Sequence, residues 1–281
     1  MVKKSFIIYL IAIFVFVLIA PCLSFAGTVG NSAMISSQKG AGLFSMRRDK
    51  NIPIKVGFDA EFLFDRDLHA NASSNAELTG GEWYMAKISY TMFNRFEPYV
   101  KMGIAHIKAR WTEAGADAQL ESDSNFAWAL GGKLLVWQFD GPRIQILTDG
   151  FYRVADLDAE EGRYDGSVAT LNTASSRFEV REWQIALLAA TEIDVGGPAR
   201  EEVLGITSIV PYAGLKYSDI GGRLRLVHNS GLYNNPGEIE SDKNFGMFVG
   251  CDFVGPNSVL LNLEGRFIDE TAMTAGLEVL F

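Results

Sequence analysis

The sequence predicts a closed, antiparallel, up-and-down β-barrel of about ten strands that crosses a membrane. Apolar and polar residues alternate with a period of two along most of the chain, and short and long connections alternate between these segments. A wall between lipid and a polar lumen requires this period. Because open sheet edges are not tolerated in lipid, a sheet can span a membrane only as a closed barrel.

The first 26 residues have the features of a secretory signal. Lys3 and Lys4 precede the apolar run Phe6–Ala20, and Ser24-Phe25-Ala26 places small residues at the positions that a signal peptidase reads. We expect cleavage after Ala26 and export to the bacterial outer membrane.

Two alternatives to cleavage follow from the same segment. A retained anchor is one, although the run is shorter than the roughly 20 apolar residues of a spanning helix. A lipoprotein is the other, because Cys22 follows an apolar stretch, but Pro21 makes a poor lipidation site.

Residues 27–51 are polar and are expected to form a periplasmic segment, and residues 52–281 the barrel. Without residues 1–26 the net charge changes from −9 to −11, because Lys3 and Lys4 are lost. This acidic balance argues against a nucleic-acid partner. Cys251 is the one cysteine after residue 26, so no intrachain disulfide is expected.

Ten alternating segments account for residues 53–281. The sixth is the least regular, since its first half is charged and its second half is apolar on both faces. The segments are Pro53–Phe64, Gly81–Met92, Glu97–Arg110, Asp123–Trp137, Arg143–Arg153, Ser176–Thr191, Ile206–Tyr217, Lys243–Val254, Asn257–Ile268 and Thr271–Phe281.

The connections follow the parity of an outer-membrane barrel, in which short periplasmic turns alternate with longer outer loops. The turns at Asn94-Arg95, Asp140–Pro142 and Gly255-Pro256 are short, whereas Glu192–Gly205 is long for that side. The expected outer loops are long and polar: Asp65–Gly80, Trp111–Ser122, Val154–Ser175 and Ser218–Asp242. The alternating stretch Arg223–His228 is interpreted as a local extension within an outer loop, which keeps the count even. Eight or twelve strands, or a secreted β-sandwich, are alternatives.

Several segments together resemble a known class of proteins. They are the signal at 1–26, Glu97–Gly103 after a short turn, Pro211–Tyr217, Leu263–Thr271 and the terminal Phe281. On these residues the chain resembles the small outer-membrane β-barrel proteins of diderm bacteria, the porin-like and OmpA-type superfamily. The resemblance covers Ile52–Phe281 and implies that Phe281 is the recognition end for the barrel-assembly machinery. It does not fix a function, because this fold carries many.

The inward face is predicted to carry both signs of charge. The lumen-lining candidates are Asp59, Glu61, Lys87, Lys101, Lys133, Arg143, Asp149, Arg153, Lys216, Asp252, Glu264, Arg266 and Glu278. In a narrow barrel these groups have to pair, because an isolated buried charge is expensive. Ten strands with a mixed-charge interior favour a plugged or very narrow lumen. The expected role is structural or surface-interacting, with a narrow passive channel for ions or small solutes as the alternative. On the lipid side, Tyr84, Tyr90, Trp128 and Tyr152 are expected to form interfacial girdles.

An enzymatic role is a remote alternative. Asp65, Asp67 and His69, with Asp219 and His228, resemble the carboxylate and histidine sets of the omptin proteases, but their spacing departs from that family's paired motifs. We therefore expect no catalytic residue, no cofactor and no metal. Expected partners are outer-membrane lipids and lipopolysaccharide, to which the acidic outer loops would be linked by bridging cations, and the assembly machinery.

Overall fold

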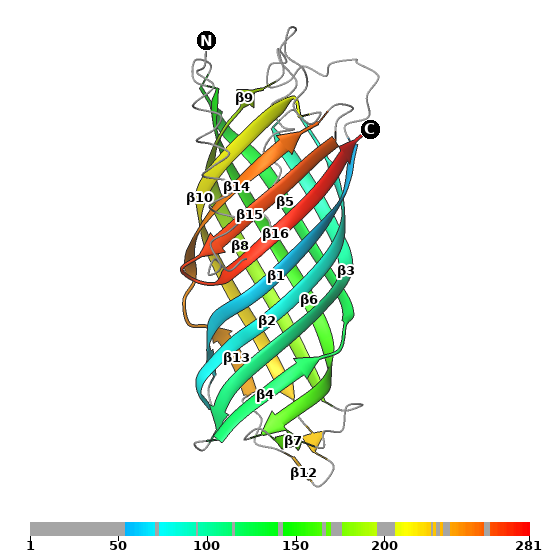
Figure 1. The fold of residues 1–281 in the computed structure, drawn as a ribbon, viewed down its shortest axis with the longest axis vertical. Coiled ribbons are helices and arrows are strands. Elements are labelled where there is room, and N and C mark those ends of the chain that lie inside the picture. The colour runs from blue at the N-terminus through cyan, green and yellow to red at the C-terminus, as the bar shows by residue number, and fades with distance from the viewer. Residues whose placement is uncertain are drawn as a thin grey trace.

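The chain forms a closed antiparallel β-barrel in a computed structural model (Figure 1). The structure describes residues 54–70, 73–93, 95–113, 116–139, 143–164, 167–169, 176–195, 206–225, 227–228, 231–232, 237–255 and 259–281. The wall is a ring of 10 strands, with β4 and β5 sharing one place, and the predicted fold class is confirmed. The expected signal at 1–26 and the segment 27–51 lie outside the described residues.

Eleven strand segments build the wall. They are β1 (Ile54–Ala70), β2 (Ser73–Tyr90), β3 (Phe96–Glu113), β4 (Ala116–Ser122), β5 (Asn125–Gln138), β6 (Ile144–Tyr164), β8 (Arg177–Thr191), β10 (Ser208–Arg225), β14 (Phe245–Val254), β15 (Val259–Phe267) and β16 (Thr271–Leu280). The shorter segments are β7 (Ser167–Ala169), β9 (Ile193–Asp194), β11 (Val227–His228), β12 (Gly231–Leu232) and β13 (Gly237–Ser241).

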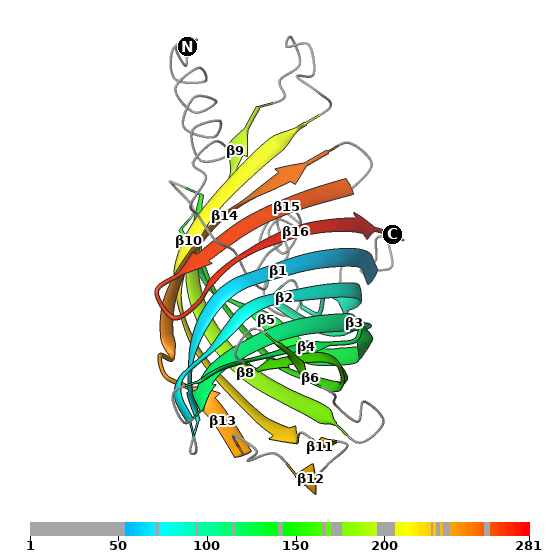
Figure 2. The ribbon, with the colours of Figure 1, turned by 60° about the horizontal axis from the view of Figure 1, so that its bottom comes forward.

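The first and last strands close the ring. Val56 on β1 pairs with Val279 on β16, and the Phe281 amide donates to the Ile54 carbonyl at 3.1 Å. Figure 2 shows β1 and β16 side by side. The half of the barrel next to this end, where Ile54 and Leu280 lie, is called the base half below, and the opposite half is called the far half.

The far half of the wall has two strands fewer than the base half. Strands β14, β15 and β16 stop partway along the barrel, at Phe245, Phe267 and Thr271 (Figure 1). Beyond them β13 fills the gap, because it pairs with β1 at Leu68–Ala70 and with β10 at Gly221–Leu224. The far ring therefore consists of β1, β2, β3, β4, β6, β8, β10 and β13.

A bulge in β1 marks the same level. The register against β16 shifts between Leu63 and Asp65, so the inward positions change parity after Leu63. Arg66 and Leu68 are consequently buried inside the barrel, whereas Asp65 and His69 are exposed outside it.

The outer surface of the base half is an apolar belt. On β14, for example, Phe245, Met247, Val249, Cys251 and Phe253 all point outward. At a rise of about 3.4 Å per residue and a tilt of about 40°, such a run spans roughly 20 Å along the barrel axis. Aromatic side chains lie at both edges of the belt: Tyr84, Trp128, Tyr152, Trp183, Tyr217 and Phe245 at the far edge, and Tyr90, Phe93, Phe96, Trp137, Phe139 and Phe281 at the base edge.

The polarity of the wall reverses in the far half. On β6, Asp156, Asp158 and Glu160 point outward, while Ala155, Leu157 and Ala159 point inward. The inward apolar side chains of this half form one buried cluster, called the far core. Its larger members are Leu63, Leu68, Leu78, Trp83, Ile107, Trp111, Leu120, Leu157, Phe178, Val180, Ile220, Leu224 and Ile239.

The prediction of long outer loops was wrong for most of the residues concerned. Residues assigned to them belong to strands, because β1, β3, β6 and β10 continue to Ala70, Glu113, Tyr164 and Arg225. The stretch Arg223–Arg225 continues the wall strand β10, whereas the sequence predicted an extension within an outer loop, and Val227–His228 forms the short strand β11. These segments are polar on the outside only, since their outer faces lie beyond the apolar belt.

Candidate functional site: the charged lumen

The base half and the level of the bulge hold the charged residues of the lumen. All but one of the lumen-lining candidates point inward, and most are fully buried. They are Asp59, Glu61, Lys87, Lys101, Lys133, Asp149, Arg153, Lys216, Asp252, Glu264, Arg266 and Glu278.

Arg143 is the exception, because it is exposed at the base rim, just before β6, rather than buried inside the lumen; its backbone has a left-handed φ of 51°. Its Nη1 lies 2.5 Å from Asp194 Oδ2.

Six further charged residues point into the lumen and were not among the candidates. They are Lys55, Arg66, Glu97, Glu182, Asp269 and Glu270. The alternation of β1 and β3 already contained the signal for Lys55 and Glu97. The bulge hid Arg66, and the expected turn between the last two strands hid Asp269 and Glu270.

One group of these residues, called the base cluster, consists of Lys55, Asp59, Lys87, Glu97, Lys101, Lys133, Asp149 and Glu278. Lys87 Nζ lies 2.6 Å from Glu278 Oε1, and Lys101 Nζ lies 2.7 Å from Asp59 Oδ2. Lys55 contacts Glu97 directly. Each of these three ammonium groups thus has a carboxylate partner.

Tyr99 organises one side of the base cluster. Its hydroxyl donates to Asp149 Oδ1 at 3.0 Å. The ammonium groups of Lys87 and Lys101 lie 4.9 and 5.5 Å from the centroid of its ring, within the range of cation–π attraction. The aromatic ring therefore attracts two like charges that lie on one wall.

A second group lies at the level where the strand number changes and is called the junction cluster: Glu61, Arg66, Arg153, Glu182, Lys216, Glu264, Arg266, Asp269 and Glu270. Arg153 lies 2.6 Å from Glu61 and 2.5 Å from Glu182. Arg266 Nη1 lies 3.1 Å from Glu270 Oε1. Lys216 contacts Glu270 and lies 2.7 Å from Asp269.

A polar network continues from the junction cluster toward the base. The Tyr212 hydroxyl donates to Glu264 Oε2 at 2.8 Å and accepts from the Asn262 amide at 2.8 Å. The same amide donates to Asp252 Oδ1 at 2.5 Å. Hydrogen bonding of this kind offsets the cost of burying charges, which would otherwise exceed the attraction between them.

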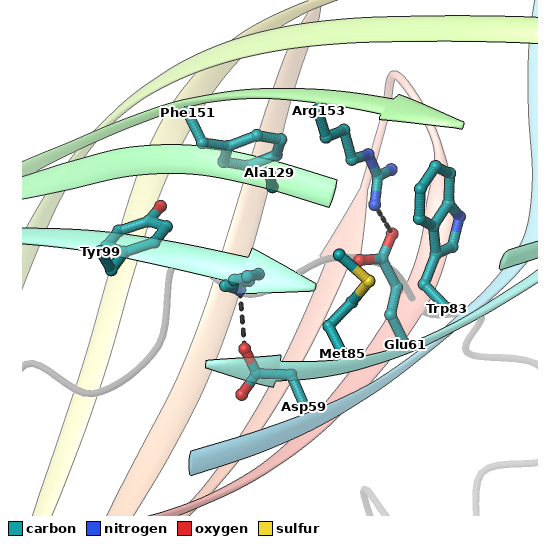
Figure 3. A pocket seen from close by; sticks show the side chains of 9 residues that line it. Asp59, Glu61, Trp83, Met85, Tyr99, Ala129, Phe151 and Arg153 are labelled. Atoms are coloured by element: carbon teal, nitrogen blue, oxygen red, sulfur yellow. Dashed lines mark hydrogen bonds and ion pairs between the residues drawn. The ribbon is translucent and has the colours of Figure 1, made fainter. Parts of the chain in front are cut away.

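A small cavity lies between the two clusters (Figure 3). Asp59, Glu61, Lys101 and Arg153 line it together with Trp83 and other apolar side chains, and the Arg153 guanidinium lies 4.1 Å from the centroid of the Trp83 ring. Its volume of about 20 Å³ accommodates roughly one water molecule.

Beyond the junction cluster the far core fills the barrel. A ring of about eight strands leaves an interior that side chains just fill. Leu78, Leu157 and Phe178 are fully buried there. A second apolar cluster lines the base half between β5 and β15, with Leu147, Phe248 and Leu260 fully buried.

Asp65, Asp67, His69 and Asp219, which resemble part of a protease set, lie on the outside of the far half. Asp67 Oδ2 accepts from Lys243 Nζ at 2.6 Å, and Asp219 Oδ2 accepts from the Trp183 indole at 3.3 Å. Asp65 and His69 are exposed on the outer surface. The side chain of His228 lies outside the described residues. Among the described residues, no three His, Cys, Asp or Glu side chains are grouped to hold a metal ion.

Ion pairs cover the outer surface of the far half. Glu121 on β4 accepts from Lys108 on β3 at 2.7 Å and lies 3.3 Å from His106 Nε2. The hydrogen bond from Lys108 holds the pKa of the Glu121 carboxyl below its usual value. Asp158, predicted to lie in an acidic loop, accepts from the Asn125 amide on β5 at 3.0 Å.

The outer surface of the barrel indicates which environment surrounds it. A closed β-barrel with an apolar belt between two aromatic edges has the exterior of an outer-membrane protein, and this chain is an integral outer-membrane barrel. In the part of the chain that the structure describes, no helix is long and apolar enough to cross a membrane.

Comparison with known proteins gives distant structural likenesses. No protein-family model and no curated protein matches the sequence. Among solved structures, the outer-membrane protease OmpT of Escherichia coli matches with a TM-score of 0.41 and 12% identity, over 84% of this chain and 100% of that one. The transport unit of the autotransporter AIDA-I of E. coli matches with a TM-score of 0.40 and 9% identity, over 86% and 94%. The translocator domain of the autotransporter NalP of Neisseria meningitidis matches with a TM-score of 0.41 and 10% identity, over 82% and 88%.

Proposed function

We propose that this protein is a non-conducting, non-enzymatic outer-membrane barrel with a structural or surface-interacting role. The observation that carries the proposal is the filling of the lumen at successive levels. The base and junction clusters occupy the membrane-spanning part, and the far core occupies the part beyond it.

Ion conduction needs a continuous hydrated path, and two features argue against one. The cavity between the clusters has room for about one water molecule. In the far half, an ion would have to cross an apolar core such as that around Phe178, where nothing would compensate for the loss of its hydration.

Planar-bilayer recordings of the refolded protein test the proposal. We expect no unitary conductance, with insertion verified by the difference in gel mobility between the folded and heated protein. Reproducible unitary steps from the wild-type protein would overturn the proposal.

A narrow passive channel is the second candidate, and the cavity beside Asp59 and Lys101 is the observation that favours it. If ions pass this cavity, Arg153→Ala should change the conductance, because the guanidinium lines it. Arg181→Ala is the matched control, since Arg181 lies on the outer surface. Equal recordings from both variants would argue against conduction through the lumen.

The absence of enzymatic activity has its own test. A peptidase assay on the wild-type protein should give no turnover above that of the Asp65→Ala and Asp67→Ala variants. Activity that both substitutions abolish would favour the protease alternative. The outward positions of these two carboxylates, with Asp67 paired to Lys243, support the non-enzymatic proposal.

The proposed partners follow from the surface. Outer-membrane lipids would cover the apolar belt, and lipopolysaccharide, through bridging cations, would contact the charged outer face of the far half. Phe281 is exposed at the base rim, where the barrel-assembly machinery could reach it. Deletion of Phe281 should lower the yield of assembled barrel in cells, measured as the heat-modifiable fraction.

A further inference from the structure

We propose that β13 is a displaceable strap that opens the wall of the far half sideways, between β1 and β10. The strap consists of Gly237–Ser241 and pairs with β1 just beyond the residue at which β16 begins, on the far side of the turn that connects β15 to β16. It completes the eight-stranded ring at the one place where the wall strands of the base half do not continue.

The strap is the shortest strand in the far ring. It forms three residue pairs with β1, at Leu68–Ala70, and four with β10, at Gly221–Leu224. The seam between β8 and β10 in the same ring runs without interruption from Arg177 to Ala190. Opening the barrel at β13 therefore breaks fewer ladder hydrogen bonds than opening it there.

Between Gly237 and Glu240 the side chains of the strap hold it weakly, whereas Ser241 at its other end is hydrogen-bonded to Arg66 and to the Ile220 amide. Ile239 is its one apolar side chain and packs over Gly222 in the far core. The outward Glu238 forms a 3.2 Å pair with Arg223, but both side chains are largely exposed, and such pairs contribute little.

At the Ser241 end of the strap, the polar groups of the junction cluster lie directly inside the wall. Ser241 Oγ accepts from Arg66 Nη2 at 2.9 Å and from the Ile220 amide at 2.9 Å. In the same cluster, Arg66 Nε, Asp269 Oδ1 and Arg266 Nη2 are buried without a hydrogen-bond partner. Water that entered on opening would satisfy these atoms, whereas elsewhere in the far half it would meet apolar side chains.

These features define a lateral opening just beyond the apolar belt, through which water or a small polar solute would reach the junction cluster. The base cluster does not depend on the strap, so the opening would not create a pore across the membrane. The inference thus stands independently of whether the protein conducts.

Amide hydrogen exchange in lipid nanodiscs tests the strap. We expect the amides of Ile239–Ser241 to exchange at least about tenfold faster than those of Leu157–Ala159 on β6 in the same ring. A lock is provided by His69→Cys with Glu240→Cys in a Cys251→Ala background, because these outward residues are directly paired. The oxidised lock should remove the difference, and reduction should restore it.

A chemical probe gives a second measurement. Ala70 on β1 pairs with Ile239, and Ala118 on β4 is a buried alanine of the same core away from the strap. We expect Ala70→Cys to react with a small charged methanethiosulfonate faster than Ala118→Cys, and faster still when combined with Ile239→Ala. Equal rates for the two reporters, or strap amides as protected as those of β6, would overturn the proposal.

Discussion

Arg66 on β1 and Glu270 in the turn between β15 and β16 form an ion pair of 3.0 Å in the centre of the barrel. The same nitrogen, Arg66 Nη1, lies 2.8 Å from Glu182 on β8. One guanidinium thus ties the bulged strand, the opposite wall and the turn at the level where three strands end. The pair lies where the ring changes from ten strands to eight.

Loss of either partner of this pair should be strongly destabilising. Arg66→Met and Glu270→Gln each leave a buried charge with fewer partners, and we expect each to cost about 3–5 kcal/mol. Reversible urea unfolding of the barrel in lipid vesicles measures the effect.

Arg223→Met is the matched control, because its pair with Glu238 is exposed. We expect it to change the free energy of unfolding by less than about 1 kcal/mol. Similar losses from Arg66→Met and Arg223→Met would contradict the role given to the buried pair.

Much of the base half could be predicted from the sequence. Its outer face meets lipid, so residues such as Ile88, Met102 and Leu130 alternate with polar ones in the pattern that a membrane barrel requires. The inward positions of Asp59 and Lys133 follow from the same alternation.

The far half could not be predicted in the same way. Asp156-Leu157-Asp158 alternates as regularly as the base half, but with charges outside and apolar residues inside, so its acidic composition indicated a loop. The bulge at Leu63 and Asp65 depends on where β16 ends, which is a property of tertiary pairing. Arg66 was assigned to a loop for that reason.

The far core should contribute stability as the interior of a soluble protein does. Phe178 is 0% exposed, and Phe178→Ala should cost about 3–5 kcal/mol through lost burial and the cavity left behind. Ile185→Ala, on the lipid-facing side of the same strand, should cost less because lipid fills the space. Both free energies of unfolding come from the same urea titrations. A larger loss from Ile185→Ala than from Phe178→Ala would contradict the assignment of Phe178 to the core.

The apolar belt predicts a strong dependence of charge tolerance on depth. Leu130 points outward within the belt and is 56% exposed, so Leu130→Arg should cost about 2–4 kcal/mol in a bilayer. Glu160→Arg, on the outward face of the far half, should change stability by less than about 0.5 kcal/mol. Equal losses of stability at the two positions would show that the membrane boundary does not lie between them.

The ion pair between Glu121 and Lys108 predicts a measurable pKa. Because the ammonium donates to the carboxylate, the pKa of Glu121 should lie below its ordinary value of 4.5. A depressed folded-state pKa stabilises the fold above the unfolded pKa, and that contribution disappears as the pH falls through the folded value. The carboxylate is partly exposed, so the effect on stability should be small.

A carbon-detected NMR titration of the Glu121 carboxyl measures this pKa. Lys108→Met should raise it toward the ordinary value by removing the main cause of the shift. An unchanged midpoint in that variant would exclude the hydrogen bond as the cause.

The space around Gly246 shows how closely the junction cluster packs against the wall. A Cβ at this position would overlap Asp269 Oδ1 and lie 2.9 Å from Lys216 Cε. Asp269 cannot easily withdraw, because Ser218 Oγ donates to it at 2.9 Å and Lys216 lies 2.7 Å away. We therefore expect Gly246→Ala to cost about 1–3 kcal/mol by overpacking.

Gly221 is the comparison position, since a Cβ there would meet nothing within 4 Å. Gly221→Ala should be neutral, or stabilise by up to about 1 kcal/mol by restricting the unfolded chain. Adding Asp269→Ala to Gly246→Ala should recover little, because it leaves Lys216 with one carboxylate fewer in the cluster. If Gly246→Ala proved as harmless as Gly221→Ala in urea titrations, Asp269 would have room to move, and the junction cluster would be looser than its distances imply.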